Sequence, residues 1–246
     1  MAKRVLIFGG TGEARDLAAL LLAGGYDVTT SLAGITSAPA KLEGQLVRGG
    51  FGGAEGIAAY VAAQNIAAIV DATHPFAARI SYHAHAAASD CGIPYLRLER
   101  PPWVAQPDDG WTEVAGTEAA VAGIPSDARV MLTVGHKAAA AFLGRLDIEG
   151  VVRMIEAPDC DFPEGWLLIR ERPPFSIEHE TMLLGKHGIT ILVTKNSGGG
   201  QTYAKLVAAR ALRLPVIVIA RPQKPDAPRF ATPAALAVAL RAALDP

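Results

Sequence analysis

The stretch Val5–Leu21, VLIFGGTGEARDLAALL, decides the fold of this chain. Its first four residues form an apolar run suited to a strand buried on both faces, and Gly9, Gly10 and Gly12 then turn the chain into a helical pattern. This order lets main-chain N–H groups at a helix N-terminus approach a pyrophosphate, because glycine has no side chain in the way. We therefore expect a nucleotide-binding turn, with a purely structural tight turn as the alternative.

The glycine pattern departs from the dinucleotide fingerprint G-x-G-x-x-G. Read from Gly10, the third glycine is replaced by Arg15; read from Gly9, the pattern becomes G-G-x-G-x-A, with Ala14 as the small residue. The context is stronger than the motif itself, because the turn follows a strand, opens a helix, and is followed by a second apolar strand at 26–31 with βαβ spacing.

The end of this second strand favours NADP over NAD. An NAD site usually places Asp or Glu there to bond the ribose 2′-hydroxyl, whereas this chain reads TTSL at 29–32. The Ser31 hydroxyl can donate to a phosphate oxygen, and positive charge could come from Arg15, Lys41 or Arg48. An ordinary strand end is the alternative.

The composition indicates a globular α/β protein. The chain has 246 residues, 50% of them hydrophobic, which is enough core for one large or two modest domains. The formal net charge of −1 gives no bulk attraction to nucleic acid or to an anionic membrane. Cysteines 91 and 160 show no metal-ligand spacing, and no apolar segment approaches membrane-spanning length. We therefore expect a cytoplasmic protein that binds no metal, no nucleic acid and no membrane.

Strands and helices alternate along the rest of the chain, which predicts mostly parallel, doubly wound sheets. The proline-broken stretch ERPPW at 99–103 interrupts this alternation, and a second α/β series restarts after it. We therefore predict two domains, at 1–99 and 100–246.

A second motif, DATHPFA at 71–77, follows the strand expected at 66–71. The carboxyl end of a strand in an open α/β sheet lies at the ligand crevice. Pro75 suits the first position of the next helix, which Asp71 or Thr73 could cap. His74, held extended before a proline, could bond a ligand or pass a proton, and a spectator histidine is the alternative.

A third motif, KNSGGGQT at 195–202, follows the strand expected at 189–195 and precedes a helix beginning at Tyr203. It repeats the arrangement of buried strand, glycine loop and helix N-terminus, and Lys195 and Lys205 flank it with positive charge. We expect an anion-binding loop, with a surface loop as the alternative. The turn at 135–137 (GHK) is a third candidate of this kind.

Several enzyme classes lose support because their motifs are missing. The chain has no HExxH, no G-x-S-x-G and no P-loop, and Tyr203 is followed by a lysine after two residues rather than four. The last observation removes the Tyr-x-x-x-Lys pair of short-chain dehydrogenases. A reductase built from these parts would have to act by bringing the nicotinamide close to its substrate.

Together, GGTGEAR, DATHPFA, and KNSGG followed by TYAKL and PVIVIARP resemble the precorrin-6A reductases of cobalamin biosynthesis, in the right order over essentially the whole chain. The resemblance implies two Rossmann-like domains with the site in the cleft between them. It implies NADPH-dependent reduction of one macrocycle double bond of precorrin-6A to give precorrin-6B, and we expect the hydride to pass directly from NADPH. The implied partners are this tetrapyrrole and, transiently, neighbouring enzymes of the pathway.

The resemblance also assigns residues by position. Cofactor contacts fall on Gly9, Gly10, Thr11, Gly12, Glu13, Ser31 near the ribose phosphate, and Thr73, His74 and Pro75 by the nicotinamide. His74 is the catalytic candidate, for positioning or proton delivery. The second domain would face the cleft with Lys195, Ser197, Gly198, Gly199, Thr202 and Lys205. Because the substrate carries many carboxylates, charge and loop position add Arg79, Arg100, Lys137 and Arg221 as its partners.

Two other classes share the first glycine turn. One is a non-catalytic NADP-responsive sensor, which would not need a basic, glycine-rich second lobe. The other is a nucleotide-sugar transferase or epimerase on paired Rossmann domains. The sequence also leaves open whether the tetrapyrrole is metal-free or contains cobalt.

Overall fold

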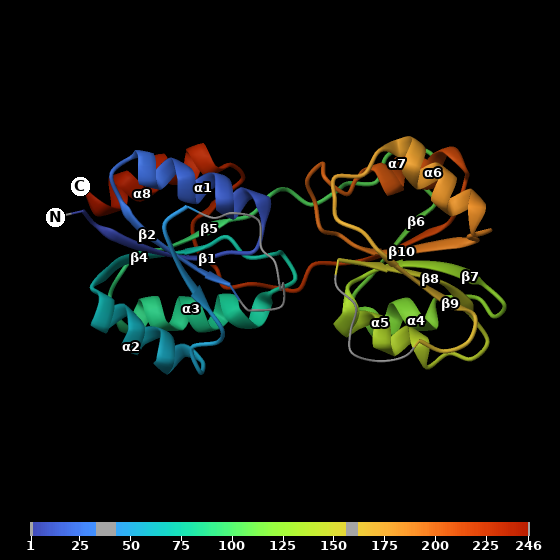
Figure 1. Cartoon of the computed structure of the whole chain (residues 1–246), viewed down its shortest axis with the longest axis horizontal. Helices are drawn as coiled ribbons and strands as arrows, with labels where there is room; N and C mark the ends of the chain where they lie inside the picture. The colour runs from blue at the N-terminus through green and yellow to red at the C-terminus, as the bar shows by residue number, and fades with distance from the viewer. Residues whose placement is uncertain (1, 33–42, 156–161, 246) are drawn as a thin grey trace. The chain divides into compact units, whose positions relative to one another are not determined.

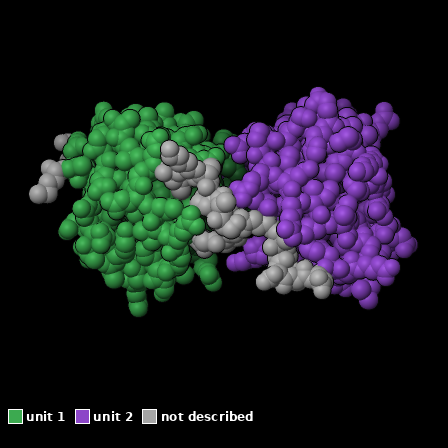
Figure 2. Space-filling view, viewed as in Figure 1, with its two compact units in different colours: residues 1–101, 222–246 green, residues 102–221 purple. Residues whose placement is uncertain are grey.

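The computed structural model describes residues 2–32, 43–155 and 162–245. It divides the chain into two compact units, coloured separately in Figure 2. Unit 1 comprises residues 1–101 and 222–246, and unit 2 comprises residues 102–221. Each unit has its own six-stranded sheet, and every strand pair in both sheets is parallel. The expected α/β fold with parallel sheets is therefore confirmed.

Unit 1 is a three-layered α/β/α structure (Figure 1). Its strands, in the spatial order β12-β5-β4-β1-β2-β3, are β1 (Arg4–Phe8), β2 (Asp27–Leu32), β3 (Gln45–Arg48), β4 (Ile66–Asp71), β5 (Tyr95–Leu98) and β12 (Arg229–Phe230). One face carries α1 (Gly12–Ala23) and α8 (Pro233–Leu244), and the other carries α2 (Ala54–Gln64) and α3 (Ala78–Asp90). The apolar runs of β1 and β4 are buried because helices cover both faces.

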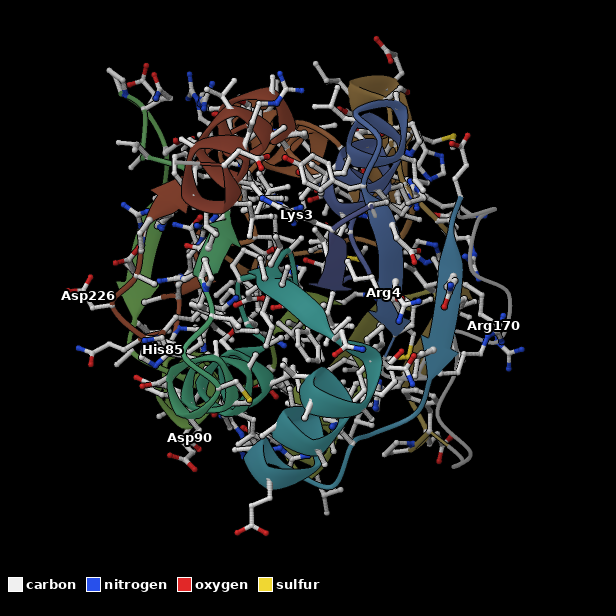
Figure 3. All side chains as sticks on the ribbon, turned by 90° about the vertical axis from the view of Figure 1, so that its left-hand side faces the viewer. Lys3, Arg4, His85, Asp90, Arg170 and Asp226 are labelled. Atoms are coloured by element: carbon white, nitrogen blue, oxygen red, sulfur yellow. The ribbon has the colours of Figure 1, made fainter. Side chains whose placement is uncertain are left out.

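Figure 3 shows the edge of unit 1 at which β1 begins, with Lys3 and Arg4 there and Asp90 at the end of α3. The Arg4 side chain donates to Asp27 Oδ2 at 3.1 Å and to the Gln64 carbonyl at 2.8 Å, which ties the start of β1 to its neighbours. Because the sheet is parallel, all the carboxyl ends of its strands lie at the opposite edge.

Unit 2 repeats this architecture. Its strands, in the spatial order β6-β11-β10-β7-β8-β9, are β6 (Trp111–Val114), β7 (Arg129–Thr133), β8 (Glu149–Met154), β9 (Trp166–Arg170), β10 (Ile191–Lys195) and β11 (Val216–Ile219). One face carries α6 (Ile177–Lys186) and α7 (Ala204–Ala211), and the other carries α4 (Thr117–Ala122) and α5 (His136–Leu143) (Figure 1). Residues of α6 and α7 share one buried apolar cluster with Met131, Val151 and Leu192 of the sheet.

The strand order reverses between β1 and β4 in unit 1 and between β7 and β10 in unit 2. In open α/β sheets, ligands bind outside the carboxyl ends of the strands at such a reversal. The glycine turn and DATHPFA follow β1 and β4, whereas the turn at 135–137 and KNSGGGQT follow β7 and β10. Each sheet therefore brings two of the sequence motifs to its switch point.

The division of the chain differs from the expected boundary between 1–99 and 100–246. Residues 222–246 return to unit 1, where β12 pairs with β5 and α8 packs on α1. The strand that follows β5 along the chain, β6, joins the edge of the sheet of unit 2 instead. The physical reason is that Leu236 and Leu240 of α8 are fully buried in the core of unit 1.

The strands expected at 5–8, 26–31, 66–71 and 189–195 are observed within two residues of these bounds. The two-residue strand β12 was not predicted, and α3 begins at Ala78 rather than at Pro75. The expectations for Lys41 and Cys160 fall outside the described residues. Among the helices of the described ranges, none has the length and apolar character needed to cross a membrane.

Truncating Leu236 tests whether α8 is part of the core of unit 1. We expect Leu236→Ala to lower the free energy of unfolding by about 3 kcal/mol, because the side chain is fully buried and its removal leaves a cavity. Val238→Ala on the same helix is the control, since Val238 is 73% exposed and should change stability by less than about 0.5 kcal/mol. Equal effects in urea unfolding would contradict this packing.

Candidate active site

Thr11 fixes the glycine turn of unit 1 at both sides. Its Oγ1 accepts a hydrogen bond from the Ala14 N–H at 3.1 Å, which caps α1, and donates to the Ala72 carbonyl at 2.9 Å. The turn is thereby tied to the 71–77 loop. Thr11 was predicted as a cofactor contact, and the structure assigns its hydroxyl to these two bonds.

Gly9 and Gly10 serve different purposes. A Cβ on Gly9 would lie 2.8 Å from Thr30 Cγ2, so this glycine is required by packing against β2. Gly10 has φ of +112°, which favours glycine, and a Cβ placed there would meet no atom within 4 Å. The main chain at Gly10 therefore borders open space, which fits the close approach of a phosphate.

Ser31 lies level with the ends of the neighbouring strands, because Phe8 pairs with Ser31 on one side and with Asp71 on the other. The Ser31 carbonyl accepts from the Gly9 N–H at 2.9 Å, and the residue is 6% exposed. Arg48 ends the adjacent strand β3 opposite Leu32 and is exposed. Arg15 is exposed on the first turn of α1. Arg15 therefore lies on the helix that follows the turn, and Arg48 lies on the strand next to β2.

A buried ionic cluster lies beneath the 71–77 loop. The Asp71 carboxylate accepts from Thr73 Oγ1 at 2.6 Å and from the Tyr95 hydroxyl at 3.0 Å. Lys224 Nζ lies 3.4 Å from Asp71 Oδ2 and 3.1 Å from Thr73 Oγ1. The side chains of Asp71 and Lys224 are 0% and 3% exposed. This residue pair joins the returning C-terminal segment to the end of β4.

The surroundings of each group in this cluster determine whether it is charged. Burial alone would raise the pKa of Asp71, but the charge of Lys224 and hydrogen bonds from Ser81 and Thr73 hold that pKa below its ordinary value. Burial lowers the pKa of Lys224, and the negative charges of Asp71 and Glu99 oppose this shift. Burial, with the charge of Asp71, raises the pKa of the Tyr95 hydroxyl, so Tyr95 stays protonated as a donor. The carboxylate therefore remains ionised among its donors.

Neither Asp71 nor Thr73 caps the helix that follows the 71–77 loop, contrary to one expectation. Asp71 and Thr73 bond each other instead, and α3 begins after Ala77, with no side-chain cap. Pro75 and Phe76 form a turn in which the Ala77 N–H donates to the His74 carbonyl at 2.8 Å. His74 Nδ1 accepts from the Phe76 N–H at 3.2 Å, so the proton of the neutral ring is on Nε2. The ring therefore has a fixed orientation.

Glu13 and Arg100 bond each other, which changes the expectation for both. Arg100 Nη1 donates to both carboxylate oxygens of Glu13, at 3.1 and 3.0 Å. Arg100 also belongs to unit 1, not to the second domain where the sequence placed it. A small hollow here is lined by Thr11, Glu13, Thr73, Pro75, Leu98, Glu99 and Arg100. Four of the predicted cofactor residues therefore line one hollow.

In unit 2, the KNSGGGQT loop begins at the end of β10 and is held from beneath. Asn196, 4% exposed, accepts from the Trp103 N–H at 2.8 Å and donates to the Trp103 carbonyl at 3.0 Å. The Trp103 indole N–H donates to the Gly199 carbonyl at 2.7 Å. Gly198 and Gly199 both have φ of +69°, the left-handed region that glycine occupies without strain.

Two predicted substrate-binding cations instead hold this loop. Lys205 is 4% exposed, and its Nζ donates to the Thr202 carbonyl at 2.7 Å and lies 4.8 Å from the centre of the Trp103 ring. Arg221 donates to the carbonyls of Asn196 and Ser197, at 2.9 and 3.2 Å. Both side chains were expected to meet substrate directly, and the structure uses them on the main chain of the loop.

The remaining predicted cations differ in burial. Lys195 ends β10, and burial lowers the pKa of its ammonium group. Lys137 is exposed on the first turn of α5, after β7, and Arg79 is exposed on the first turn of α3 in unit 1.

In the described part of the chain, no group of three or more His, Cys, Asp or Glu side chains is placed to hold a metal ion.

Four residues of these clusters were not predicted from the sequence: Lys224, Tyr95, Asn196 and Trp103. Nothing local signals Lys224 or Tyr95, because their roles depend on which strands become neighbours. Asn196 had a signal, since it stands directly after a buried strand within the third motif. Trp103 stood in the stretch interpreted only as a linker.

Comparison with known proteins decides the family. The model of the precorrin-6x reductases, CbiJ/CobK, matches residues 4–241. The chain belongs to the precorrin-6x reductase family. Its similarity to "Precorrin-6A reductase" of Rhodococcus erythropolis is 46% identity over 226 residues, which cover 91% of each chain.

Other similar proteins support the same family assignment. "Cobalt-precorrin-6A reductase" of Priestia megaterium is 33% identical, over 89% of this chain and 91% of the relative. Among solved structures, "CobK precorrin-6A reductase" matches with a TM-score of 0.91 and 38% identity, over 98% of this chain and 96% of that one. The family resemblance expected from the three motifs is therefore confirmed.

Removing the Lys224 ammonium tests the buried pair. We expect Lys224→Met to lower the free energy of unfolding by about 3–5 kcal/mol at neutral pH, because it leaves the Asp71 carboxylate buried and uncompensated. Without the charge of Lys224, the pKa of Asp71 rises from its lowered value, so acid protonates the carboxyl at a higher pH and the loss should shrink as the pH falls.

The matched control for this prediction is the double variant Asp71→Asn/Lys224→Met, which carries no buried charge at the pair. It should recover most of the lost stability in urea unfolding. A pH-independent loss, or a double variant as unstable as the sum of the two singles, would contradict the account.

Proposed function

We propose that the protein catalyses the NADPH-dependent reduction of one macrocycle double bond of precorrin-6A to give precorrin-6B, in cobalamin biosynthesis. The observation that carries this proposal is the family membership over residues 4–241, combined with a glycine turn that borders open space at the switch point of unit 1. The alternatives of a sensor and of a nucleotide-sugar enzyme have no comparable support.

The cofactor assignment rests on unit 1. When bound, NADPH supplies the hydride. The residues of the chain bind, orient and shield the cofactor. Main-chain N–H groups at Gly10–Gly12 would meet the pyrophosphate at the N-terminus of α1. Ser31, with Arg15 or Arg48 on the neighbouring elements, would meet the 2′-phosphate, since no carboxylate at the end of β2 repels it.

The 71–77 loop would lie by the nicotinamide, and His74 would act as a positioning group. Its Nδ1 accepts from the Phe76 N–H, and a proton added at Nδ1 would remove that bond. The neutral ring can donate from Nε2 but has no second proton to deliver. This favours orientation of a bound group by His74, with the proton that balances hydride transfer coming from solvent or another acid.

The substrate assignment rests on the loop in unit 2. Carboxylates of the tetrapyrrole would bind to residues of this loop, namely Ser197, Gly198, Gly199 and Thr202. Lys195 and Lys137, at the same edge of the sheet, would add positive charge. Relatives named for precorrin-6A are 40–46% identical to the chain, whereas those named for cobalt-precorrin-6A are 31–33% identical. This difference favours the metal-free substrate.

The direct test follows NADPH absorbance under anaerobic conditions with purified protein and precorrin-6A, with NADH and cobalt-precorrin-6A in parallel. We expect oxidation that requires both protein and tetrapyrrole, with at least tenfold higher kcat/KM for NADPH than for NADH. Cofactor binding without turnover of either tetrapyrrole would refute the reductase proposal.

Ser31→Asp serves as the variant control for the cofactor assignment. A carboxylate at this position should repel the 2′-phosphate, so KM for NADPH should rise about tenfold or more while KM for precorrin-6A stays unchanged. An unchanged KM for NADPH would place the 2′-phosphate elsewhere.

A further inference from the structure

Side chains hold several carbonyl groups of the KNSGGGQT loop. Arg221 holds the Ser197 carbonyl, the Trp103 indole holds that of Gly199, and Lys205 holds that of Thr202. In a planar trans peptide, the C=O of one residue and the N–H of the next point in opposite directions. Fixing a carbonyl therefore fixes the direction of the following N–H.

Two glycine N–H groups therefore point away from the side chains that hold the preceding carbonyls. The N–H of Gly198 points away from Arg221, and that of Gly200 points away from the Trp103 indole. Within the described ranges, neither N–H donates to a protein acceptor. Gly200 is exposed, so its N–H can be reached by a ligand. An unpaired N–H on the exposed Gly200 of a glycine loop suits an anion.

Trp103 is the residue best placed to set this geometry. Asn196 clamps its main chain through both the N–H and the carbonyl, so the indole is held in position before it holds Gly199. The residue is 8% exposed, and the Tyr203 ring, 6.0 Å away between centroids, and Lys205 pack against the indole. The indole N–H thus comes from a fixed frame, as a positioning group needs.

We propose that Trp103 is a positioning residue for substrate binding: its indole N–H fixes the Gly199 carbonyl and so presents the Gly200 N–H to a carboxylate of the tetrapyrrole. This inference rests on the proposed function and refines it. Carboxylate recognition at this loop is then carried by main-chain N–H groups. Lys205, Arg221 and Trp103 act through the loop, without touching the substrate.

Trp103→Phe tests this role, because phenylalanine keeps an aromatic ring near Lys205 and removes the N–H donor. The expected result is a five- to tenfold rise in KM for precorrin-6A, the usual effect of one lost hydrogen bond, with kcat and KM for NADPH unchanged. Equilibrium dialysis without NADPH should show the same loss in Kd for precorrin-6A.

Trp111→Phe is the matched control, because Trp111 packs against the same core cluster and the same indole-to-phenyl change is made. It should leave every kinetic constant unchanged. If Trp103→Phe lowers the urea midpoint but leaves KM and Kd for precorrin-6A unchanged, Trp103 is merely structural and the inference is overturned. A fall in kcat with constant KM overturns it as well.

If Trp103→Phe does not fold, 3-benzothienylalanine at position 103 keeps the shape of the indole and replaces only its N–H by sulfur. The same rise in KM is expected, and an unchanged KM refutes the proposal. Wild-type turnover separates the two claims: without turnover of precorrin-6A the proposed function fails, whereas turnover with an unaffected Trp103 variant refutes only this inference.

Discussion

The buried pair between Asp71 and Lys224 is the contact on which the organisation of unit 1 depends. It joins residues 153 positions apart in the chain, at the end of β4, in a place where neither charge meets water. The same returning segment is fixed by Arg97, whose Nη1 donates to the Pro225 carbonyl at 2.8 Å. These contacts tie the segment that leads into β12 and α8 to the sheet, and they hold the loop that carries His74.

The two sheets share one physical arrangement at their switch points. In unit 1, Thr11 and Asp71 use their side chains to fix two neighbouring loops; in unit 2, Asn196, Trp103 and Arg221 fix the glycine loop after β10. In both, polar side chains hold the loops that follow the central strands. This explains why charged residues that look like ligand contacts in the sequence are engaged within the protein.

Local patterns predicted the fold well because strands buried on both faces, glycine turns and helix starts leave clear signals. The glycine turn after β1 and the KNSGGGQT loop are observed where they were expected. Parallel pairing followed from the alternation of strands and helices. Tertiary pairing could not be predicted in the same way: β12 has two residues and no periodicity, and Lys224 shows no sign in the sequence of its buried partner.

The roles of individual charges were the least predictable part of the site. Arg100 and Glu13 were assigned to substrate and cofactor separately, yet they bond each other. Lys205 was expected at a ligand and is instead buried over Trp103. Position in a loop indicates which residues gather at the sheet edge, but only the packed structure says which of them are already satisfied.

We propose that NADPH binds to the two loops at the switch point of unit 1. Hydrogen–deuterium exchange of the intact protein with and without NADPH tests it most directly. We expect slower exchange in peptides covering residues 9–13 and 72–77, with residues 196–202 unchanged until the tetrapyrrole is added. Protection confined to residues 196–202, or absent from both unit 1 loops at saturating NADPH, would contradict it.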